Sequence, residues 1–279
     1  MMIWDLLLDA LLDTLKALPF LYLAFLLMEF CEHKAGSRIN HWLASSRWWG
    51  APIGALCGLI PQCGFSVAAA NLYAGGLISL GTLLAVFLST SDEALLILLG
   101  QSNDFSVIWQ LLICKFLIGT IAGLIIDLFS RRKRHGGDMD HFCVSCGCHE
   151  NHSLPAAALH HTIHTLIPLF LFTFLIGLAM EWIGQDAFAS ILLKGSPLQP
   201  LIAGLVGLIP NCASSVLLTQ LYLSGALSFA SLLAGLCANS GVALLLLFKS
   251  NASHKENFTI LGILYSISVL CGILVQFIC

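Results

Sequence analysis

The chain contains the same short element twice. Gly58–Cys63, with the sequence GLIPQC, returns 149 positions later as Gly207–Cys212, with the sequence GLIPNC. The offset continues without a gap to Leu98 in the first copy and Leu247 in the second, with roughly half of the residues identical. Two similar halves, each interrupted by a proline inside an apolar segment, are typical of membrane proteins in which the important residues lie where the halves meet. The chain is therefore expected to fold as a duplicated unit.

The composition places the chain in a membrane. Hydrophobic residues make up 58% of its 279 residues and charged residues only 10%, which is too little charge to cover a water-soluble domain. Apolar stretches of about twenty residues, the length that crosses a hydrocarbon core of ~30 Å, occur at Ile3–Phe30, Val107–Phe129, Thr162–Trp182, Ser228–Phe248 and Phe258–Ile278. The sequence predicts an all-α polytopic protein that crosses the inner membrane of the cell several times.

Three regions follow one another along the chain. Residues 1–130 are expected to form a first transmembrane repeat, and residues 155–279 a second. Residues 131–154 between them are polar and rich in Cys and His, so they cannot be embedded in lipid. Each repeat begins with a long apolar helix that contains a proline, Pro19 or Pro168, and continues with a glycine-rich segment around the Pro-Gln/Asn-Cys element.

The segment around Pro61, with its copy around Pro210, has two interpretations. It is either a kinked helix that crosses the membrane or a re-entrant hairpin that descends to the proline and returns. In the hairpin interpretation, the basic residues before the element and those at Arg131–Arg134 fall together in the cytoplasm, as the positive-inside rule favours. Three true crossings per half then invert the second half. We therefore expect two inverted repeats, each with a re-entrant or broken helical hairpin.

Glycines are spaced along the descending arm of each expected hairpin, at Gly50, Gly54 and Gly58 and again at Gly204 and Gly207. Small residues at such a spacing let two helices approach closely. The two arms of each hairpin are therefore expected to pack against each other.

Polar side chains gather at the two hairpin tips and at a second expected helix break in each half. Unwound backbone at membrane depth survives only where protein or a water-filled cavity satisfies its polar groups, so the breaks indicate a substrate site near the midplane. The candidate ligands are Gln62, Cys63, Ser66, Asn71, Ser91, Asp92, Glu93, Asn211, Cys212, Ser215, Gln220, Asn239 and Ser240. The alternative is that these groups only cap broken helix ends and hydrogen-bond across helices.

Asp92 and Glu93 are the acidic part of this set, and the second copy has Gly241 and Val242 in their place. Burying a carboxylate at the bilayer centre costs on the order of 3 kcal/mol. An acid that one copy does without suggests function, so Asp92 is expected to bind a cation or to take up a proton. The alternative is an ion pair with Lys115, the sole lysine deep in a crossing helix.

Three charged residues are expected to act in gating or coupling. Glu32 and Glu181 match across the repeat and lie at helix ends, where a carboxylate reaches water, and Lys115 is the third. Asp127 is expected to form an interfacial ion pair with Arg131.

The linker between the halves carries a cluster of metal-binding residue types. The run from Cys143 to His149 has the pattern Cys-x-x-Cys-x-Cys-His, whose spacing can hold a tetrahedral soft-metal ion. The candidate ligands are His141, Cys143, Cys146, Cys148, His149 and His152. A cytoplasmic role in metal sensing or delivery is one interpretation, and a flexible tether with reduced thiols is the other.

Enzymatic motifs are absent from the sequence. It has no Walker element, no His-Glu-x-x-His pattern and no basic surface of the kind that binds nucleic acid. The chain is therefore not expected to be an enzyme, to be driven by ATP, or to require a cofactor beyond a transported ion.

With its paired Pro-Gln-Cys and Pro-Asn-Cys elements and the Cys/His-rich linker between them, the chain resembles the ten-helix heavy-metal exporter family. Members of that family are labelled arsenic efflux proteins or manganese transporters. The resemblance covers essentially the whole chain and implies efflux of a metal or metalloid from the cytoplasm. Counting each hairpin arm as a helix gives the ten helices that the family description implies.

Ligand chemistry separates the candidate ions. Asp92 with its neighbouring amides is a hard, oxygen-rich set that suits Mn²⁺, whereas Cys63 and Cys212 suit Zn²⁺ or trivalent arsenic. We expect export of a divalent transition metal by alternating access, with Mn²⁺ first and Zn²⁺, Fe²⁺ and arsenite as alternatives. An anion or small organic solute transporter and a metal sensor acting through the linker are the competing hypotheses. The expected partners are the lipid bilayer, the metal ion, coupling protons and a second copy in a homodimer.

Overall fold

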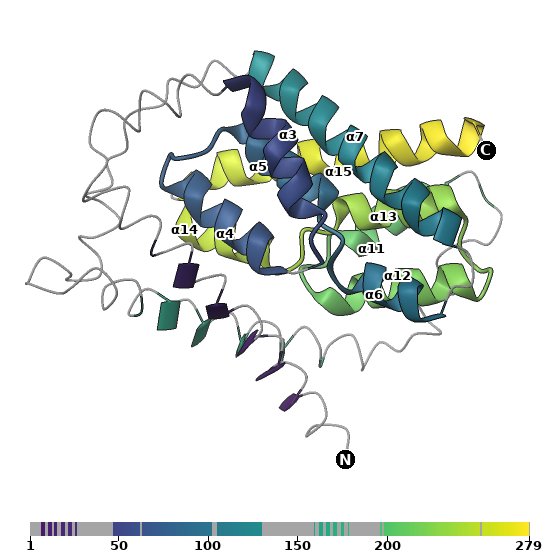
Figure 1. Ribbon diagram of the computed structural model, residues 1–279, viewed down its shortest axis with the longest axis horizontal. Helices are drawn as coiled ribbons and strands as arrows, with labels where there is room; N and C mark the ends of the chain where they lie inside the picture. The colour runs from purple at the N-terminus through teal and green to yellow at the C-terminus, as the bar shows by residue number, and fades with distance from the viewer. Residues whose placement is uncertain are drawn as a thin grey trace, which may run out of the picture.

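The computed structural model describes residues 47–61, 63–101, 105–129, 196, 198–251 and 253–278, with separate helical positions between 7 and 26 and between 159 and 178. Every regular element in these residues is an α-helix, as the composition predicts (Figure 1). In chain order the helices are α3 (Arg47–Gly58), α4 (Cys63–Ala74), α5 (Leu80–Ser89), α6 (Asp92–Gln101), α7 (Phe105–Phe129), α11 (Gln199–Gly207), α12 (Cys212–Leu223), α13 (Phe229–Ala238), α14 (Ala243–Ser250) and α15 (His254–Ile278).

The helices repeat with the offset of the sequence. α4 and α12, α5 and α13, and α7 and α15 begin and end at positions that differ by 149. Gly76 after α4 has φ 73° and Gly225 after α12 has φ 71°, a left-handed conformation that glycine adopts without steric cost. Ser79 and Ser228 then cap α5 and α13, each accepting a hydrogen bond from a backbone N–H three residues on. The duplication therefore extends to helix α15.

Four segments of the described residues are long and apolar enough to cross a membrane, namely Leu80–Gly100, Phe105–Phe129, Phe229–Ser250 and His254–Phe277. The last three confirm expected crossings. Leu80–Gly100 is the copy of Phe229–Ser250 and supplies the third of the three crossings expected in the first half, although it is not among the apolar stretches named from the sequence. The expected crossings at Ile3–Phe30 and Thr162–Trp182 fall where the structure describes only separate residues.

The four spans divide into an inner and an outer pair. In their most apolar stretches, Leu80–Gly100 is 75% buried and Phe229–Ser250 is 89% buried, whereas α7 and α15 are only 33% and 28% buried. Each inner span is interrupted, α5 by a break before α6 and α13 by a break before α14. The centre of the protein is therefore built from two broken helices.

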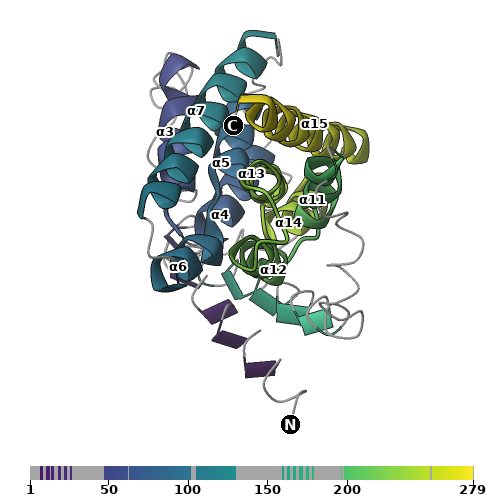
Figure 2. The same cartoon turned by 90° about the vertical axis from the view of Figure 1, so that its right-hand side faces the viewer.

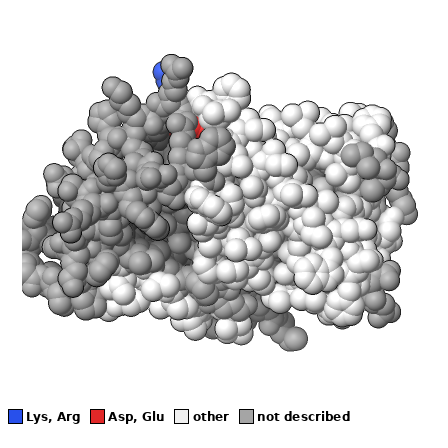
Figure 3. Space-filling model, turned by 45° about the horizontal axis from the view of Figure 1, so that its top comes forward, with Lys and Arg blue, Asp and Glu red and all other residues white. Residues whose placement is uncertain are grey.

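The outer helices expose apolar side chains in stripes. On α7 these recur every four residues, which places them on one helix face: Trp109, Ile113, Leu117, Ile121 and Ile125. Figure 3 shows that the described part of one face of the molecule is almost free of charged side chains. An exposed apolar face of this extent is suited to lipid rather than to water.

The glycines of α3 face α5, so the prediction that they pack two hairpin arms together is wrong. A Cβ at Gly58 would lie 2.1 Å from Ser89 Oγ on α5, and one at Gly54 would lie 3.2 Å from Val86. In the second half, a Cβ at Gly207 would lie 2.1 Å from the carbonyl oxygen of Gly235 on α13, and Gly204 faces α15. Close packing therefore joins the short arm α3 or α11 to the helices beside it.

The two halves lie side by side, with α3–α7 on one side and α11–α15 on the other (Figure 2). α3, α5 and α7 pack together, as do α11, α13 and α15. The remaining helices make contacts between the halves, because α4 packs on α14 and α6 packs on α12. On this interface, the hydroxyl of Tyr73 on α4 donates to the carboxylate of Glu256 at the start of α15. The halves thus form one interleaved core.

Candidate functional site

The break in each inner span is made by small polar residues that bond to nearby backbone. Between α5 and α6, the hydroxyl of Thr90 donates back to the Val86 carbonyl oxygen at 2.8 Å. Between α13 and α14, the side-chain oxygen of Asn239 accepts from the Gly241 N–H at 2.8 Å, and Gly241 has φ 57°. Such side chains offer the backbone an alternative to the helical ladder, so both helices stop in the buried interior.

Lys115 of α7 joins the two breaks. Its Nζ donates to the carbonyl oxygen of Thr90 and, at 3.0 Å, to that of Leu236 near the end of α13. Both carbonyls lose their helical partners because the helices stop, which leaves them in need of donors. The lysine side chain is completely buried. The C-terminal ends of α5 and α13, one from each half, therefore meet at one ammonium group.

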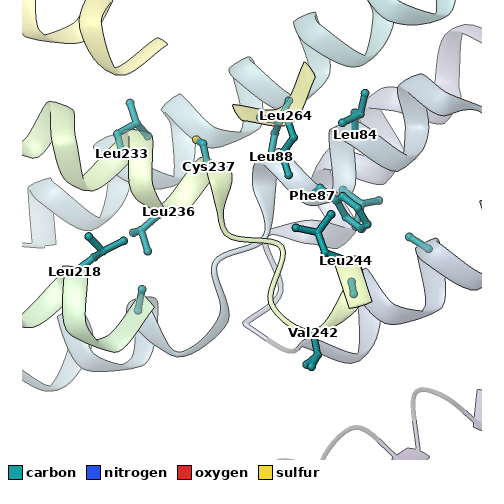
Figure 4. Packing of buried hydrophobic residues seen from close by; sticks show 14 of the residues in the cluster. Leu84, Phe87, Leu88, Leu218, Leu233, Leu236, Cys237, Val242, Leu244 and Leu264 are labelled. Atoms are coloured by element: carbon teal, nitrogen blue, oxygen red, sulfur yellow. The ribbon is translucent and has the colours of Figure 1, made fainter. Parts of the chain in front are cut away.

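Figure 4 shows the surroundings of this meeting point. The loop that follows Cys237 passes beside the end of α5, where Leu88 and Phe87 lie. Apolar side chains of both halves, among them Leu84 of α5 and Leu236 of α13, belong to the cluster around it. The polar backbone of the breaks is therefore enclosed by an apolar shell, in which an unsatisfied polar group is costly.

Helices α4 and α12, which are the second arms of the two expected hairpins, begin at the Pro-Gln/Asn-Cys elements. Asn211 precedes α12 with an extended backbone and is 4% exposed, but its side chain makes no capping hydrogen bond. Its backbone oxygen instead accepts from the Ser214 hydroxyl at 2.7 Å. Cys63 and Cys212 are the first residues of α4 and α12, where the helix dipole places partial positive charge. The Asn211 side chain is therefore buried but does not cap α12, although asparagine at this position commonly caps a helix.

Three buried side-chain atoms of the described residues have no hydrogen-bond partner, namely Asn71 Nδ2, Thr120 Oγ1 and Ser240 Oγ. Asn71 on α4 is 2% exposed, and its Oδ1 accepts from the Ser250 hydroxyl of α14 at 3.1 Å, while its Nδ2 has no hydrogen-bond partner. Ser240 in the α13–α14 break is 1% exposed, and its Oγ also has no partner. Such groups are rare in folded proteins and call for an explanation such as a ligand.

The structure buries seven of the predicted ligands in the interior, namely Ser66, Asn71, Ser91, Asn211, Ser215, Asn239 and Ser240. Gln220 differs, since it is exposed on α12. The side chains of Cys63, Asp92, Glu93 and Cys212 are not described, although Asp92 begins α6. Outside the described residues lie Gln62, Glu32, Glu181 and the linker ligands His141, Cys143, Cys146, Cys148, His149 and His152. Among the side chains that are described, no three of His, Cys, Asp or Glu lie close enough to hold a metal ion.

Asp127 has contacts that the sequence did not predict. The ion pair expected with Arg131 lies outside the described residues, and the Asp127 side chain is only 5% exposed. The carboxylate accepts from the Ser79 hydroxyl and from the Gly81 N–H at the start of α5. Its role is therefore to cap the inner helix. Its place one turn from the end of α7 suggested an interfacial position, and only the packing of α7 against α5 reveals the contact.

Gln199 is a buried polar residue that the sequence pattern did not single out. Its Oε1 accepts from the Ser228 N–H at 3.1 Å and from the Ser231 hydroxyl at 3.0 Å, at the start of α13. Its Nε2 donates to the Ala226 carbonyl oxygen at 2.9 Å. A lone glutamine beside Pro200 at the start of an apolar helix is the only signal that could have drawn attention to it.

A comparison with protein families identifies the class of the molecule. The model of a family described as "Putative, 10TM heavy-metal exporter" matches residues 4–180 and 168–279, which together span nearly the whole chain. The chain belongs to this family. No curated protein and no solved structure shows a significant match to it.

Membership of the heavy-metal exporter family confirms the resemblance drawn from the paired proline elements. It agrees with the described helices, which are apolar and long enough to span a membrane several times. A membrane exporter carries a substrate rather than converting it, so the site is to be understood as a binding and release site. The breaks around Lys115 bring polar groups of both halves together in the buried interior of the described structure.

Proposed function

We propose that the protein is a secondary-active transporter that exports a divalent transition-metal ion, with Mn²⁺ favoured, from the cytoplasm by alternating access. The observation that carries the proposal is the meeting of two broken helices, one from each half, in the buried centre of the protein. Broken helices at membrane depth expose carbonyl oxygens and helix termini to a bound ion.

The course of the first half supports a re-entrant hairpin. Gly50 faces Thr82, and Gly58 faces Ser89, so α3 runs in the direction of α5 and ends beside the α5–α6 break. The chain then returns along α4 and reaches the start of α5 through only residues 75–79. α3 and α4 thus enter and leave at the same end of α5, with Pro61 at the tip.

The central contact supports an inverted arrangement of the halves. The ends of α5 and α13 that meet at Lys115 are both C-terminal ends. Their N-termini are capped by separate residues, one by Asp127 of α7 and the other by Gln199 of α11. Matched helices of two inverted repeats run in opposite directions, so broken helices of this kind can meet with their C-terminal ends at the midplane. Alternating access is then a movement of one half against the other around a fixed site.

The proposed ion ligands are oxygen atoms at the breaks and hairpin tips. Asn211 and Ser240 supply buried side-chain oxygens, and Asp92 at the start of α6 supplies the charge. Asn71 can contribute the remaining lone pair of its Oδ1, which also accepts from the Ser250 hydroxyl. Mn²⁺ and related ions accept such carboxylate and amide oxygens. Thiols at Cys63 and Cys212 would instead favour Zn²⁺ or arsenite, which therefore remain the competing substrates.

The remaining parts of the proposal concern coupling and surroundings. Protons are the proposed coupling ion, exchanged at Asp92, while Glu32 and Glu181 act as gates at the ends of the pathway. The Cys/His-rich linker at 131–154 is proposed to lie in the cytoplasm and to deliver or sense the metal. We also propose that the protein works in the inner membrane, and that a homodimer is its assembled form.

Flux measurements in proteoliposomes test the function directly. Uptake and efflux of Mn²⁺, Zn²⁺, Fe²⁺ and arsenite are followed with and without a pH gradient. Asp92→Asn is expected to abolish metal flux while leaving insertion and folding intact, and Asp92→Glu, which keeps the charge, is expected to retain part of it. An Asp92→Asn protein as active as the wild type would remove the carboxylate from the mechanism.

Two outcomes would replace the proposal. Insensitivity to all four ions would favour an anion or small organic solute, bound at the N-termini of α4 and α12. Deletion of residues 131–152 separates a transporter from a sensor, because a transporter core retains some flux without its linker. Complete loss of activity in a correctly folded deletion protein would favour the sensor.

A further inference from the structure

Lys115 is an unusual residue for the place it occupies. It lies in the middle of a helix that spans the membrane, its side chain is completely buried, and its counterpart in the second half is the apolar Leu264. Moving an ammonium group out of water costs several kcal/mol unless strong partners replace the water. The contacts of its Nζ must therefore provide a good site for a positive charge.

The contacts of Lys115 have the chemistry of a cation site. The carbonyl oxygens of Thr90 and Leu236 are hard donors of the kind that replace the hydration shell of a metal ion. They also stand at the C-terminal ends of α5 and α13, where each helix dipole contributes about half a negative charge. Two such ends converge on one point, and this favours a cation more strongly than a single helix end does.

We propose that the carbonyl oxygens of Thr90 and Leu236 form a cation site that the protein fills with its own ammonium group, Lys115. A small monovalent cation or a free alkylammonium ion fits the same site when the lysine is absent. The site is shared between the halves, because one carbonyl belongs to α5 and the other to α13. One lysine therefore bonds to both helix breaks. The second half has Leu264 at the matched position, so this lysine is not repeated there.

The role of this site in transport rests on the proposed function. In the metal-free carrier, the Lys115 ammonium neutralises the helix ends and holds the two halves together, so that the empty carrier can return. The divalent ion brings positive charge to the same region and displaces the ammonium from one or both carbonyls. Lys115 is in this sense a positioning residue that competes with the substrate rather than a ligand of it.

Replacement of the lysine by alanine, followed by rescue with free cations, tests the site without any transport measurement. The melting temperature of purified Lys115→Ala is measured in ethylammonium chloride, sodium chloride and choline chloride. We expect ethylammonium or Na⁺ to raise it by about 2 °C or more relative to choline, which is too large to enter. The wild type, whose site is filled, is expected to respond to none of them.

Two control variants separate charge from volume. Leu264→Ala opens a buried space at the matched position without removing a charge, and its melting temperature should not depend on the cation. Lys115→Met fills the space without a charge, so added cations should not stabilise it. Rescue confined to Lys115→Ala is the result that supports the site.

An equal melting temperature of Lys115→Ala in all three salts would overturn the inference. If the variant is too unstable to purify in choline chloride, the yield of folded protein after extraction in ethylammonium chloride replaces the melting curve, and no recovery overturns the inference equally. Failure of the wild type to transport any of the metals would refute the proposed function. A rise in the melting temperature of Lys115→Ala with ethylammonium or Na⁺ would still support the cation site in that case.

Discussion

The carboxylate of Asp127 on α7 accepts a hydrogen bond from the Ser79 hydroxyl at 2.7 Å, just before the first turn of α5. Its other oxygen accepts from the Gly81 N–H at 2.9 Å. A negative charge at this point complements the positive end of the helix dipole. In the second half, the neutral Gln199 of α11 performs the same task at the start of α13. The two copies therefore satisfy equivalent helix ends from helices that are not equivalent, α7 in the first half and α11 in the second.

Asp127→Ala is expected to destabilise the protein. The substitution leaves the Ser79 hydroxyl and the Gly81 N–H without their acceptor, at a cost of about 1–3 kcal/mol, or a fall of roughly 2–4 °C in melting temperature for each kcal/mol. Gln276→Ala, at the matched position on α15, is the control and should have a smaller effect. Thermal unfolding in detergent compares them, and equal melting temperatures for the two variants would show that the cap contributes nothing.

Gln199→Ala is expected to weaken the start of α13. The substitution removes the acceptor of the Ser228 N–H and the donor to the Ala226 carbonyl oxygen, each buried or partly buried, and should cost about 1–3 kcal/mol. Gln220→Ala is the matched control, because Gln220 is exposed. Hydrogen exchange of the backbone amides in residues 229–233 measures the local effect. Unchanged exchange in Gln199→Ala would contradict the capping role.

Gly207→Ala is expected to prevent close packing of α11 on α13. A methyl group there would meet the Gly235 carbonyl oxygen at 2.1 Å, and backbone cannot move aside as a flexible side chain can, so the cost should reach about 1–3 kcal/mol or more. Gly262→Ala on α15 meets open space and should be neutral or stabilise the helix by up to about 1 kcal/mol. The yield of monodisperse protein after size-exclusion chromatography compares them. A Gly207→Ala protein with wild-type yield and melting temperature would show that α11 can shift.

Ser240→Ala separates function from stability. Because the Ser240 hydroxyl is buried without a partner, its removal should leave the free energy of unfolding unchanged or raise it by about 1 kcal/mol. If the hydroxyl is an ion ligand, the same variant should need a several-fold higher Mn²⁺ concentration for half-maximal flux. Ser268→Ala, whose hydroxyl bonds within α15, is the control. Normal Mn²⁺ dependence in Ser240→Ala would exclude the hydroxyl from the site.

The repeated elements could be predicted from the sequence because their causes are local. The turns at Gly76 and Gly225, the serine caps after them and the proline elements stop and start helices at matched positions in both halves. The polar residues of the breaks could likewise be named, since serine and asparagine within apolar spans are conspicuous. The partners of these residues could not be named, because nothing in a single segment says which distant helix packs beside it.

The sequence by itself determined that the protein is duplicated, helical, embedded in lipid and interrupted by polar breaks, since each of these follows from composition or from chemistry within a few residues. Only the tertiary structure decided that α3 packs its glycines on α5, that Asp127 caps a helix, and that Lys115 bonds to Leu236 across 121 positions of the chain. Such contacts depend on how separate helices pack. Their energy comes from burying and pairing groups that are far apart in the chain, so no local pattern carries a record of them.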